Sequence, residues 1–237
     1  MSTLQGSGAL LLWLDVAAEL DRETDGWYID EHMPERIDIG GYHRARRFRA
    51  LEGAPTYLTM FEADTPDALA SAGYLQLVGK ISEQSQRIRA GFSNVVRNTF
   101  AVRASVGRGV GTMLGSLRLC PSQPHAAARA IGELDAWVPQ WMSEHGIVGV
   151  HSLQAAPEVR AKMDAVRAVG HSDATTGHVL LIEATRESDV SALRDGSLSD
   201  EALAAMGWHV EAYGLYSLLY EVSDAKPAHE APLGHRA

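Results

Sequence analysis

The order of strand-like and helix-like segments repeats once along the chain, and this repetition constrains the fold more than any other feature. Apolar periodicity in the first half predicts strand 8–17, helix 19–33, strands 41–51 and 56–63, helix 66–88 and strand 93–104. After a glycine-rich turn at 107–111 it predicts strand 112–120, helix 124–145, strands 147–155 and 177–184, a helical region 187–206 and strand 209–222. We therefore expect an α+β protein built from two β-α-β-β-α-β units, residues 8–108 and 109–222, between flexible tails at 1–7 and 223–237.

Two markers recur in the two predicted units. Trp27 in the first helix corresponds to Trp137, and Glu62 in the segment FEAD corresponds to Glu183 in IEAT. The two pairs lie at different separations, so the units differ by insertions and the duplication rests mainly on element order. Because both glutamates end equivalent strands, we interpret them as structural groups that bind a loop backbone.

A β-α-β-β-α-β unit places both helices on one face of a four-stranded antiparallel sheet and leaves the other face uncovered. Two such sheets in one chain can cover each other and enclose a barrel-like cavity. In strand 10–16, alternation places one aliphatic set on the face of the sheet that the helices cover, namely Leu10, Leu12, Leu14 and Val16. Trp13 and Asp15 are then expected to face the cavity, together with Ser116 and Arg118 of the second unit.

Composition narrows the class of protein. Apolar residues make up 46% of the chain and charged residues 22%, as in soluble globular proteins. The net charge of -9 disfavours nucleic acid and anionic membranes as partners. The apolar run 9–14 is too short for a signal or a membrane span, so we expect a cytoplasmic protein.

Since one chain supplies both sheets, a monomer can form the whole barrel, although a homodimer through strand edges or helices stays open.

The segment from Trp27 to Arg36 carries the main candidates for chemistry. On a helix, Tyr28 and His32 share one face, and Trp27 and Glu31 form a second pair beside them. Pro34 weakens the helix and lets the His32 end turn toward the sheet edge. Histidine exchanges protons near neutral pH, which makes His32 a candidate for proton transfer. The alternative is a helix-end histidine without function beside a core tryptophan.

The stretch 26–74 resembles uncharacterised bacterial proteins related to the EthD-like branch of the dimeric α/β-barrel superfamily. The shared pattern consists of Trp27, Tyr28, Glu31, His32, Pro34, Gly41, Tyr42, Arg46, Arg47, Phe48, Tyr57, Leu58 and Glu62. It covers about the first hundred residues, whereas the second half matches in element order alone. There Trp141 and Met142 stand near the places of Glu31 and His32, so we expect the reaction centre in the first unit.

This resemblance implies a tandem ferredoxin-like fold in which two antiparallel sheets pack into a dimeric-α/β-barrel-like arrangement around a cavity. Members of that superfamily include muconolactone isomerases, polyketide cyclases, cofactor-free anthrone-type monooxygenases, and haem-binding dehydratases and peroxidases. The fold therefore leaves the reaction open.

Other patterns offer less. The arginines of strand 41–51 divide by alternation into Arg44 with Arg46 and Arg47 with Arg49, and either set faces the cavity, the helices or solvent. His151, His178 and His209 lack metal-ligand spacing, so we expect no metal site. The lone Cys120 excludes an intramolecular disulfide. The glycines at 107–111 lack the lysine and the helix of a phosphate-binding loop, which disfavours ATP and nicotinamide chemistry.

We expect a cofactor-independent acid-base enzyme, of the lyase, dehydratase, isomerase or cyclase type, acting on a small hydrophobic oxygenated or aromatic molecule. In this hypothesis His32 transfers a proton, Asp15 orients it or serves as a second acid, and Glu31 is a further catalytic candidate. The candidates for substrate binding are Trp13, Trp27, Tyr28, Arg47, Tyr57 and Arg118. The alternatives are a protein that binds haem or an aromatic ligand without turnover, and an enzyme remnant with a structural role.

Overall fold

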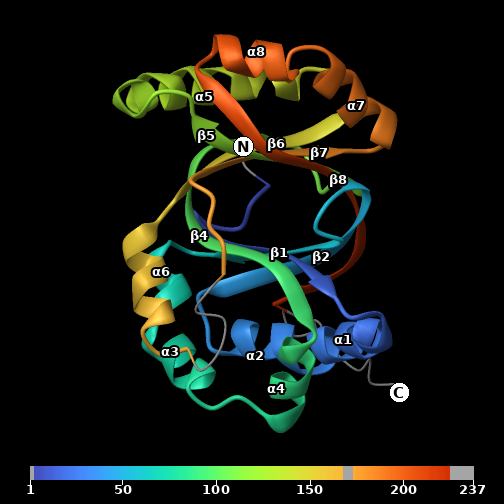
Figure 1. Ribbon diagram of the computed structural model, residues 1–237, viewed down its shortest axis with the longest axis vertical. Coiled ribbons are helices and arrows are strands. Elements are labelled where there is room, and N and C mark those ends of the chain that lie inside the picture. Colours follow the sequence, from blue (N-terminus) through green and yellow to red (C-terminus); the bar gives the residue numbers. More distant parts are fainter. Residues whose placement is uncertain (1–2, 168–172, 225–237) are drawn as a thin grey trace, which may run out of the picture.

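The computed structural model describes residues 3–167 and 173–224, and its strands lie between two groups of helices (Figure 1). All eight predicted strands are present, with ends within three residues of expectation. They are β1 (Gly8–Val16), β2 (Tyr42–Gly53), β3 (Tyr57–Ala63), β4 (Phe92–Gly107), β5 (Met113–Pro121), β6 (Ile147–Ala155), β7 (His178–Ala184) and β8 (Trp208–Ser223).

The two halves have the same strand order. Neighbouring strands run β4-β1-β3-β2 in the first half and β8-β5-β7-β6 in the second, with antiparallel pairing throughout. Pairing of β2 with β8 and of β4 with β6 closes the two sheets into one barrel. Each described strand thus has two neighbours. A homodimer that pairs free strand edges therefore has no edge to use.

Helices cover the outer faces of the barrel. The first half has η1 (Ala18–Leu20), α1 (Asp21–Trp27), the π-helical turn η2 (Tyr28–His32), α2 (Met33–Asp38), η3 (Asp67–Ala70), α3 (Ala72–Val78) and α4 (Glu83–Ala90). The second half has η4 (Pro124–Ala126), α5 (Ala127–Met142), α6 (Pro157–Asp164), α7 (Glu187–Asp195) and α8 (Asp200–Ala205). Helix α6, which the sequence did not indicate, crosses to the first half and lies beside α3 (Figure 1). No helix among the described residues is long and apolar enough to cross a membrane.

The predicted long helices are interrupted. The segment 66–88 contains η3, α3 and α4, and the segment 187–206 contains α7 and α8. Serine side chains begin three of these pieces: Ser71, Ser82 and Ser199 each accept a hydrogen bond from a backbone N–H three residues later. These residues favour helix N-termini over helix interiors, which explains the breaks.

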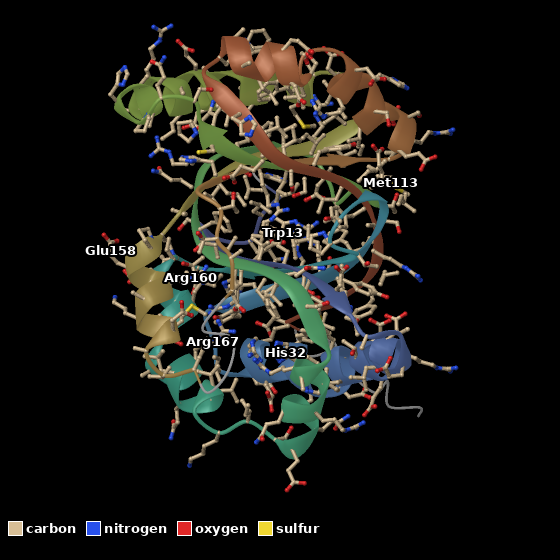
Figure 2. All side chains as sticks on the ribbon, viewed as in Figure 1. Trp13, His32, Met113, Glu158, Arg160 and Arg167 are labelled. Carbon is tan, nitrogen blue, oxygen red and sulfur yellow. The ribbon has the colours of Figure 1, made fainter. Side chains whose placement is uncertain are left out.

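Side chains fill the interior of the barrel. Leu10 packs under the helices, and Leu11 and Trp13 point inward, as alternation predicted. Figure 2 places Trp13 near the centre of the barrel. The inner cluster also contains Leu4, Phe48, Leu58, Met60, Phe100, Leu114, Leu153, Leu181 and Tyr216. The expected ligand cavity does not extend through the space between the two sheets, because a hydrophobic core fills its centre.

A buried ion cluster joins the two halves. The fully buried Arg46 guanidinium contacts Glu62 and Glu183 at 2.9 Å each. Glu62 accepts a hydrogen bond from the backbone N–H of Gln5, and Glu183 accepts one from the backbone N–H of Gly111, both at 2.8 Å. Both strand-end glutamates thus bind a loop backbone, as interpreted from the sequence.

The expected N-terminal tail is fixed over the part that the structure describes. Leu4 is buried in the barrel core, and the backbone N–H of Ser7 donates to the carbonyl oxygen of Asp64 at 2.9 Å. Residues 3–7 therefore belong to the fold, because Leu4 removes apolar surface from water and Gln5 binds Glu62. Of the expected C-terminal tail, residues 225–237 lie outside the described residues.

Candidate functional site

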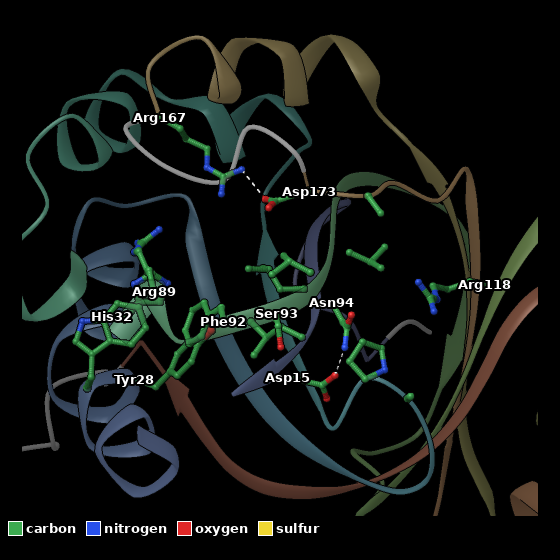
Figure 3. Close-up of a pocket in the computed structure, with 18 residues that line it drawn as sticks. Asp15, Tyr28, His32, Arg89, Phe92, Ser93, Asn94, Arg118, Arg167 and Asp173 are labelled. Carbon is green, nitrogen blue, oxygen red and sulfur yellow. Dashed lines mark hydrogen bonds and ion pairs between the residues drawn. The ribbon is translucent and has the colours of Figure 1, made fainter. Parts of the chain in front are cut away.

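A cavity of about 770 Å³ opens on the helix side of the first half and reaches the mouth of the barrel (Figure 3). Its volume is in the range typical of small-molecule sites. The lining combines apolar groups with charged ones from both halves of the chain. These residues include Leu12, Leu14, Asp15, Trp27, Tyr28, His32, Arg89, Phe92, Asn94, Val96, Arg118, Arg167 and Asp173.

A π-helical turn positions His32. The backbone N–H of Met33 donates to the carbonyl oxygen of Tyr28, five residues earlier, and Pro34 follows at the start of α2. Pro34 has no backbone N–H to donate, so the hydrogen-bond ladder of the helix is interrupted at this junction between η2 and α2. The helix was predicted to end at residue 33, but it continues to Asp38. Such turns are rare and concentrate at functional sites.

The π-turn changes which aromatic rings meet. The His32 ring stacks on Trp27, with centroids 4.1 Å apart, and meets the edge of Tyr28 at 5.1 Å. Trp27 stays beside Glu31, as helical spacing predicts, because both side chains bind Ser85 Oγ, and the wider turn adds the contact with His32. Tyr28 and His32 remain neighbours, as predicted.

His32 is suited to accept a proton. Its side chain is 6% exposed and lines the cavity, and its ring makes no hydrogen bond to another described residue. Burial, followed by the charges of Arg36, Arg89 and Arg47, lowers the pKa of His32 well below its ordinary value. The imidazole therefore stays neutral at neutral pH and keeps a lone pair for a ligand in the cavity.

Asp15 lines the same cavity but does not orient His32. Its Oδ1 accepts a hydrogen bond from the backbone N–H of Thr56, and its Oδ2 accepts one from Asn94 Nδ2, both at 2.7 Å. Burial raises the pKa of Asp15, but these hydrogen bonds outweigh it and hold the pKa below its ordinary value. Figure 3 shows the carboxylate on the far side of Phe92 and Ser93 from His32. Asp15 is therefore a bound carboxylate that does not contact His32, and its role as a second acid stays a prediction.

Asn94 owes its position to a β-bulge. The register between β1 and β4 shifts between Trp13 and Asp15, and Asn94 has a left-handed backbone with φ of 51°. Asparagine tolerates this conformation better than most residues. The bulge turns the Asn94 amide toward Asp15 and shapes the middle of the cavity.

Glu31, the third catalytic candidate, points away from the cavity. Its carboxylate accepts hydrogen bonds from Ser82 Oγ at 2.7 Å and Ser85 Oγ at 2.9 Å, and Trp27 Nε1 donates to that same Ser85 Oγ. These bonds tie η2 to the start of α4. Glu31 thus holds the helices beside His32 together, and a catalytic role for it stays a prediction.

Replacing Glu31 with alanine is expected to lower the free energy of unfolding by about 1 kcal/mol, because two hydrogen bonds to a charged acceptor are lost at a partly exposed site. Urea unfolding measures this loss. Asp30→Ala is the matched control, since Asp30 is exposed and makes no hydrogen bond to another described side chain. Equal stability of the two variants would contradict this role for Glu31.

The six predicted substrate-binding residues separate into two groups. Trp27, Tyr28 and Arg118 line the cavity, whereas Trp13, Arg47 and Tyr57 do not. Trp13 belongs to the barrel core, and the Arg118 guanidinium lies 5.6 Å from its ring centroid. Arg118 makes no ion pair with a described carboxylate, and burial lowers its pKa.

Arg47 and Tyr57 are held by other protein groups. The fully buried Arg47 guanidinium lies between the rings of Tyr28 and Tyr57, at 4.4 and 4.1 Å from their centroids. Its Nε also donates to Asp25 at 2.8 Å. The Tyr57 hydroxyl donates to Asp21, and burial raises the pKa of Tyr57 to about 12. Both side chains are used in packing α1 against the sheet and do not line the cavity, so their contact with substrate stays a prediction.

The second half lacks an equivalent of this site. Trp141, not Trp137, corresponds to Trp27, because its Nε1 donates to Ser197 Oγ at 3.1 Å just as Trp27 donates to Ser85. Trp137 is 43% exposed. Fifteen positions separate Trp27 from the next strand at Tyr42, and six separate Trp141 from Ile147. The segment that carries His32 therefore has no counterpart in the second half.

The three strand histidines of the second half do not converge. His151 lies in the barrel, with Nδ1 at 2.7 Å from Ser105 Oγ and Nε2 at 3.3 Å from Glu183. His178 packs against the Trp208 ring, and His209 is exposed. Within residues 3–167 and 173–224, no three His, Cys, Asp or Glu side chains are grouped to hold a metal ion.

Sequence reasoning missed Arg89, which enters the cavity from the last turn of α4. Its guanidinium lies 5.6 Å from the Trp27 ring centroid. The only signal was spacing: Arg89 is one helical turn after Ser85, the residue that receives the Trp27 indole.

Comparison with known proteins defines a fold class. No family model and no curated protein matches the chain. Among solved structures, an anthrone oxidase-like protein is 13% identical with a TM-score of 0.61, covering 98% of this chain and 99% of its own. A candidate monooxygenase from Fusobacterium nucleatum is 7% identical with a TM-score of 0.58, covering 94% of this chain and 97% of its own.

A candidate chlorite dismutase has a TM-score of 0.51 and 11% identity, covering 91% of this chain and 96% of its own. These likenesses show that the chain shares the fold of ferredoxin-like α/β-barrel proteins along nearly its whole described length. They do not confirm the EthD-like branch.

Proposed function

We propose that this protein is a cofactor-independent acid-base enzyme and that His32 removes a proton from a small hydrophobic oxygenated or aromatic substrate. The observation that carries the proposal is the neutral, buried imidazole on the wall of a large cavity, with no hydrogen-bond partner among residues 3–167 and 173–224. Trp27 and Tyr28 fix the ring by stacking and edge contacts, which leaves a ligand as its polar partner. Tandem duplication of one ferredoxin-like unit, with the site kept in the first copy, accords with the repeated strand order.

The chemistry of the site narrows the substrate. A histidine with a lowered pKa is a weak base, so it suits a proton that is already acidic, such as a C–H next to a carbonyl in a phenolic or polyketide-like ring. The cations Arg89 and Arg118 border the same cavity and can stabilise the negative charge that forms. Isomerase, cyclase, lyase and cofactor-free oxygenase reactions share this first step, and the first two matched structures are named anthrone oxidase-like and candidate monooxygenase.

Hydrogen–deuterium exchange tests the proposal before the full reaction is known. The protein in D₂O is mixed with an anthrone-type phenolic ketone, an unsaturated lactone and a polyketide-like β-diketone, and proton NMR follows the loss of each acidic C–H signal. We expect at least one class to exchange faster than in buffer, and His32→Gln to remove the acceleration. If no compound exchanges faster with the native protein than with His32→Gln, the proposed function is wrong.

Haem binding is the second candidate, and the same observation favours it. A neutral imidazole that faces a cavity without a protein partner is also suited to ligate haem iron, and nearby arginines suit the propionates. Bound haem would supply redox chemistry to this cavity. Absorbance of the freshly purified protein separates the two candidates, because a Soret band that disappears in His32→Gln supports haem ligation.

A further inference from the structure

A small side pocket adjoins the main cavity on the helix side of the first half. It has a volume of about 30 Å³ and shares His32, Arg89, Leu12 and Arg167 with the main cavity. Arg36 and Arg97 complete its polar lining, and its other walls are apolar, formed by Leu10, Phe61, Tyr74, Val78 and Ile81. The side pocket is therefore a positively charged end to a largely aromatic and aliphatic space.

Two of the four guanidinium groups in this pocket already form ion pairs with protein carboxylates. Arg97 Nη1 donates to Asp164 Oδ1 at 2.7 Å. Arg167 Nη1 contacts Asp164 at 3.2 Å and Asp173 at 2.9 Å. Because Arg97 and Arg167 are paired with protein carboxylates, they attract an anionic ligand less strongly than the other two arginines of the pocket do.

Arg89 has no such partner. No described carboxylate lies within 4.0 Å of its guanidinium, and its buried Nε makes no hydrogen bond in the described structure. Burial, together with the charge of Arg36, lowers the pKa of Arg89 to about 10, so the group is still a cation at neutral pH. Glu31 and Glu35 attract Arg89 only from a longer distance, and a mostly buried cation without a direct ion pair is unfavourable for the folded protein.

Arg36 is also weakly neutralised. Its side chain is 4% exposed, and its one carboxylate contact among the described residues is Glu35 at 3.9 Å, at the limit of an ion pair. Its Nη1 donates to the backbone carbonyl of His32 at 2.9 Å, which fixes the guanidinium beside the histidine. The phenyl ring of Phe61 and the phenol ring of Tyr74 lie 5.8 and 5.7 Å from it. Arg36 and Arg89 thus place two positive charges in the same pocket as His32.

The size of the side pocket selects the anion. A single water needs roughly 10 to 15 Å³ on this measure, so about 30 Å³ accepts two oxygen-sized atoms. A carboxylate has two oxygens and matches the planar donor fork of arginine, whereas a phosphate carries more oxygens than the space holds.

We propose that the side pocket binds a carboxylate of the ligand between Arg36 and Arg89, while the apolar body of that ligand occupies the main cavity beside His32. The substrate class is then an aromatic or polycyclic carboxylic acid. That the ligand is a substrate rests on the proposed function. Binding of a carboxylate does not depend on turnover.

Binding of 2-naphthoate and of its neutral isostere 2-naphthamide tests the proposal by calorimetric titration. We expect the native protein to bind the carboxylate about 10- to 100-fold more tightly than the amide, as charge-assisted hydrogen bonds allow. Arg89→Met is expected to remove this preference without weakening amide binding, and Arg89→Lys to keep part of it. Arg87→Met is the matched control, because Arg87 is on the same helix, 58% exposed, and paired with Glu23.

Thermal unfolding without ligand provides a readout that a structural role would not give. Loss of an unpaired buried cation should leave Arg89→Met at least as stable as the native protein. Equal affinity for acid and amide, no binding of either, tighter binding of phenyl phosphate, or a melting temperature of Arg89→Met below that of Arg87→Met would each overturn the proposal. If naphthoate binds as expected and the exchange assay fails, the carboxylate site stands and the acid-base function falls.

Discussion

His32→Gln is expected to slow proton exchange or turnover by 10²- to 10⁴-fold, the usual contribution of general acid-base catalysis. Glutamine retains a polar side chain of similar reach but cannot accept a proton near neutral pH. The variant should still fold, with a loss of about 1 kcal/mol, because the ring makes stacking contacts and no hydrogen bond to a described residue. His209→Gln, at an exposed position, is the control for a change of histidine alone.

The rate of the reaction and the stability of the fold should both depend on pH in a direction that the pKa of His32 sets. Since burial and the neighbouring guanidinium groups lower the pKa of His32, the base form persists as the pH falls below 6.5. The acid limb of the rate profile should therefore lie below 6.5 and disappear in His32→Gln. Stability has the same direction: the contribution of neutral His32 is complete above 6.5 and declines as the pH falls through its lowered pKa. An unchanged rate in a well-folded variant would remove His32 from the reaction.

Arg46→Met is expected to destabilise the protein by about 3 to 5 kcal/mol, the usual effect of breaking a buried ion pair. The side chain is fully buried, and its loss leaves Glu183 without its guanidinium partner, while Glu62 keeps Arg44 at 2.7 Å. Urea unfolding at neutral pH measures the change. Arg49→Met, at an exposed position of the same strand, should have little effect.

The same cluster predicts a stability change in acid. Burial raises the pKa of Glu183, but the charge of Arg46 and a hydrogen bond from His151 outweigh it and lower the pKa from 4.5 to about 2. A carboxylate with a lowered pKa stabilises the fold above pH 4.5, and this contribution, about 3 kcal/mol, is lost as the pH falls toward 2. In Arg46→Met this acid dependence should shrink. Replacing Arg46 and Glu183 together by Met and Leu should recover part of the stability, and a loss below 1 kcal/mol in the single variant would refute the role of the cluster.

Local sequence patterns were enough to predict the strands and to name His32 as a candidate site residue. Alternation in residues 10–13 correctly separated Leu10 from Trp13, because a buried strand allows one register for its two faces. The helices were harder to predict, since serines at 71 and 82 interrupt segments whose apolar spacing continues across them.

The composition of the site depended on contacts distant in sequence. Asp15 was expected beside His32, but Thr56 and Asn94 hold its carboxylate elsewhere. Arg89 carries no motif and reaches the cavity only because α4 packs on Trp27. The π-turn adds a contact between the Trp27 and His32 rings, which are five residues apart, and regular helical spacing does not anticipate it.

Closure of the barrel has a consequence for the order of events during synthesis. Strand β2 pairs with β8, so Arg44 is opposite Ser223, and the ring cannot close until the last strand has left the ribosome. Until then the edge of β2 offers unpaired backbone groups to any other extended chain. Pairing over such a long separation also favours slow folding. A nascent chain of this protein therefore passes through a long interval in which protection by chaperones has the most to contribute.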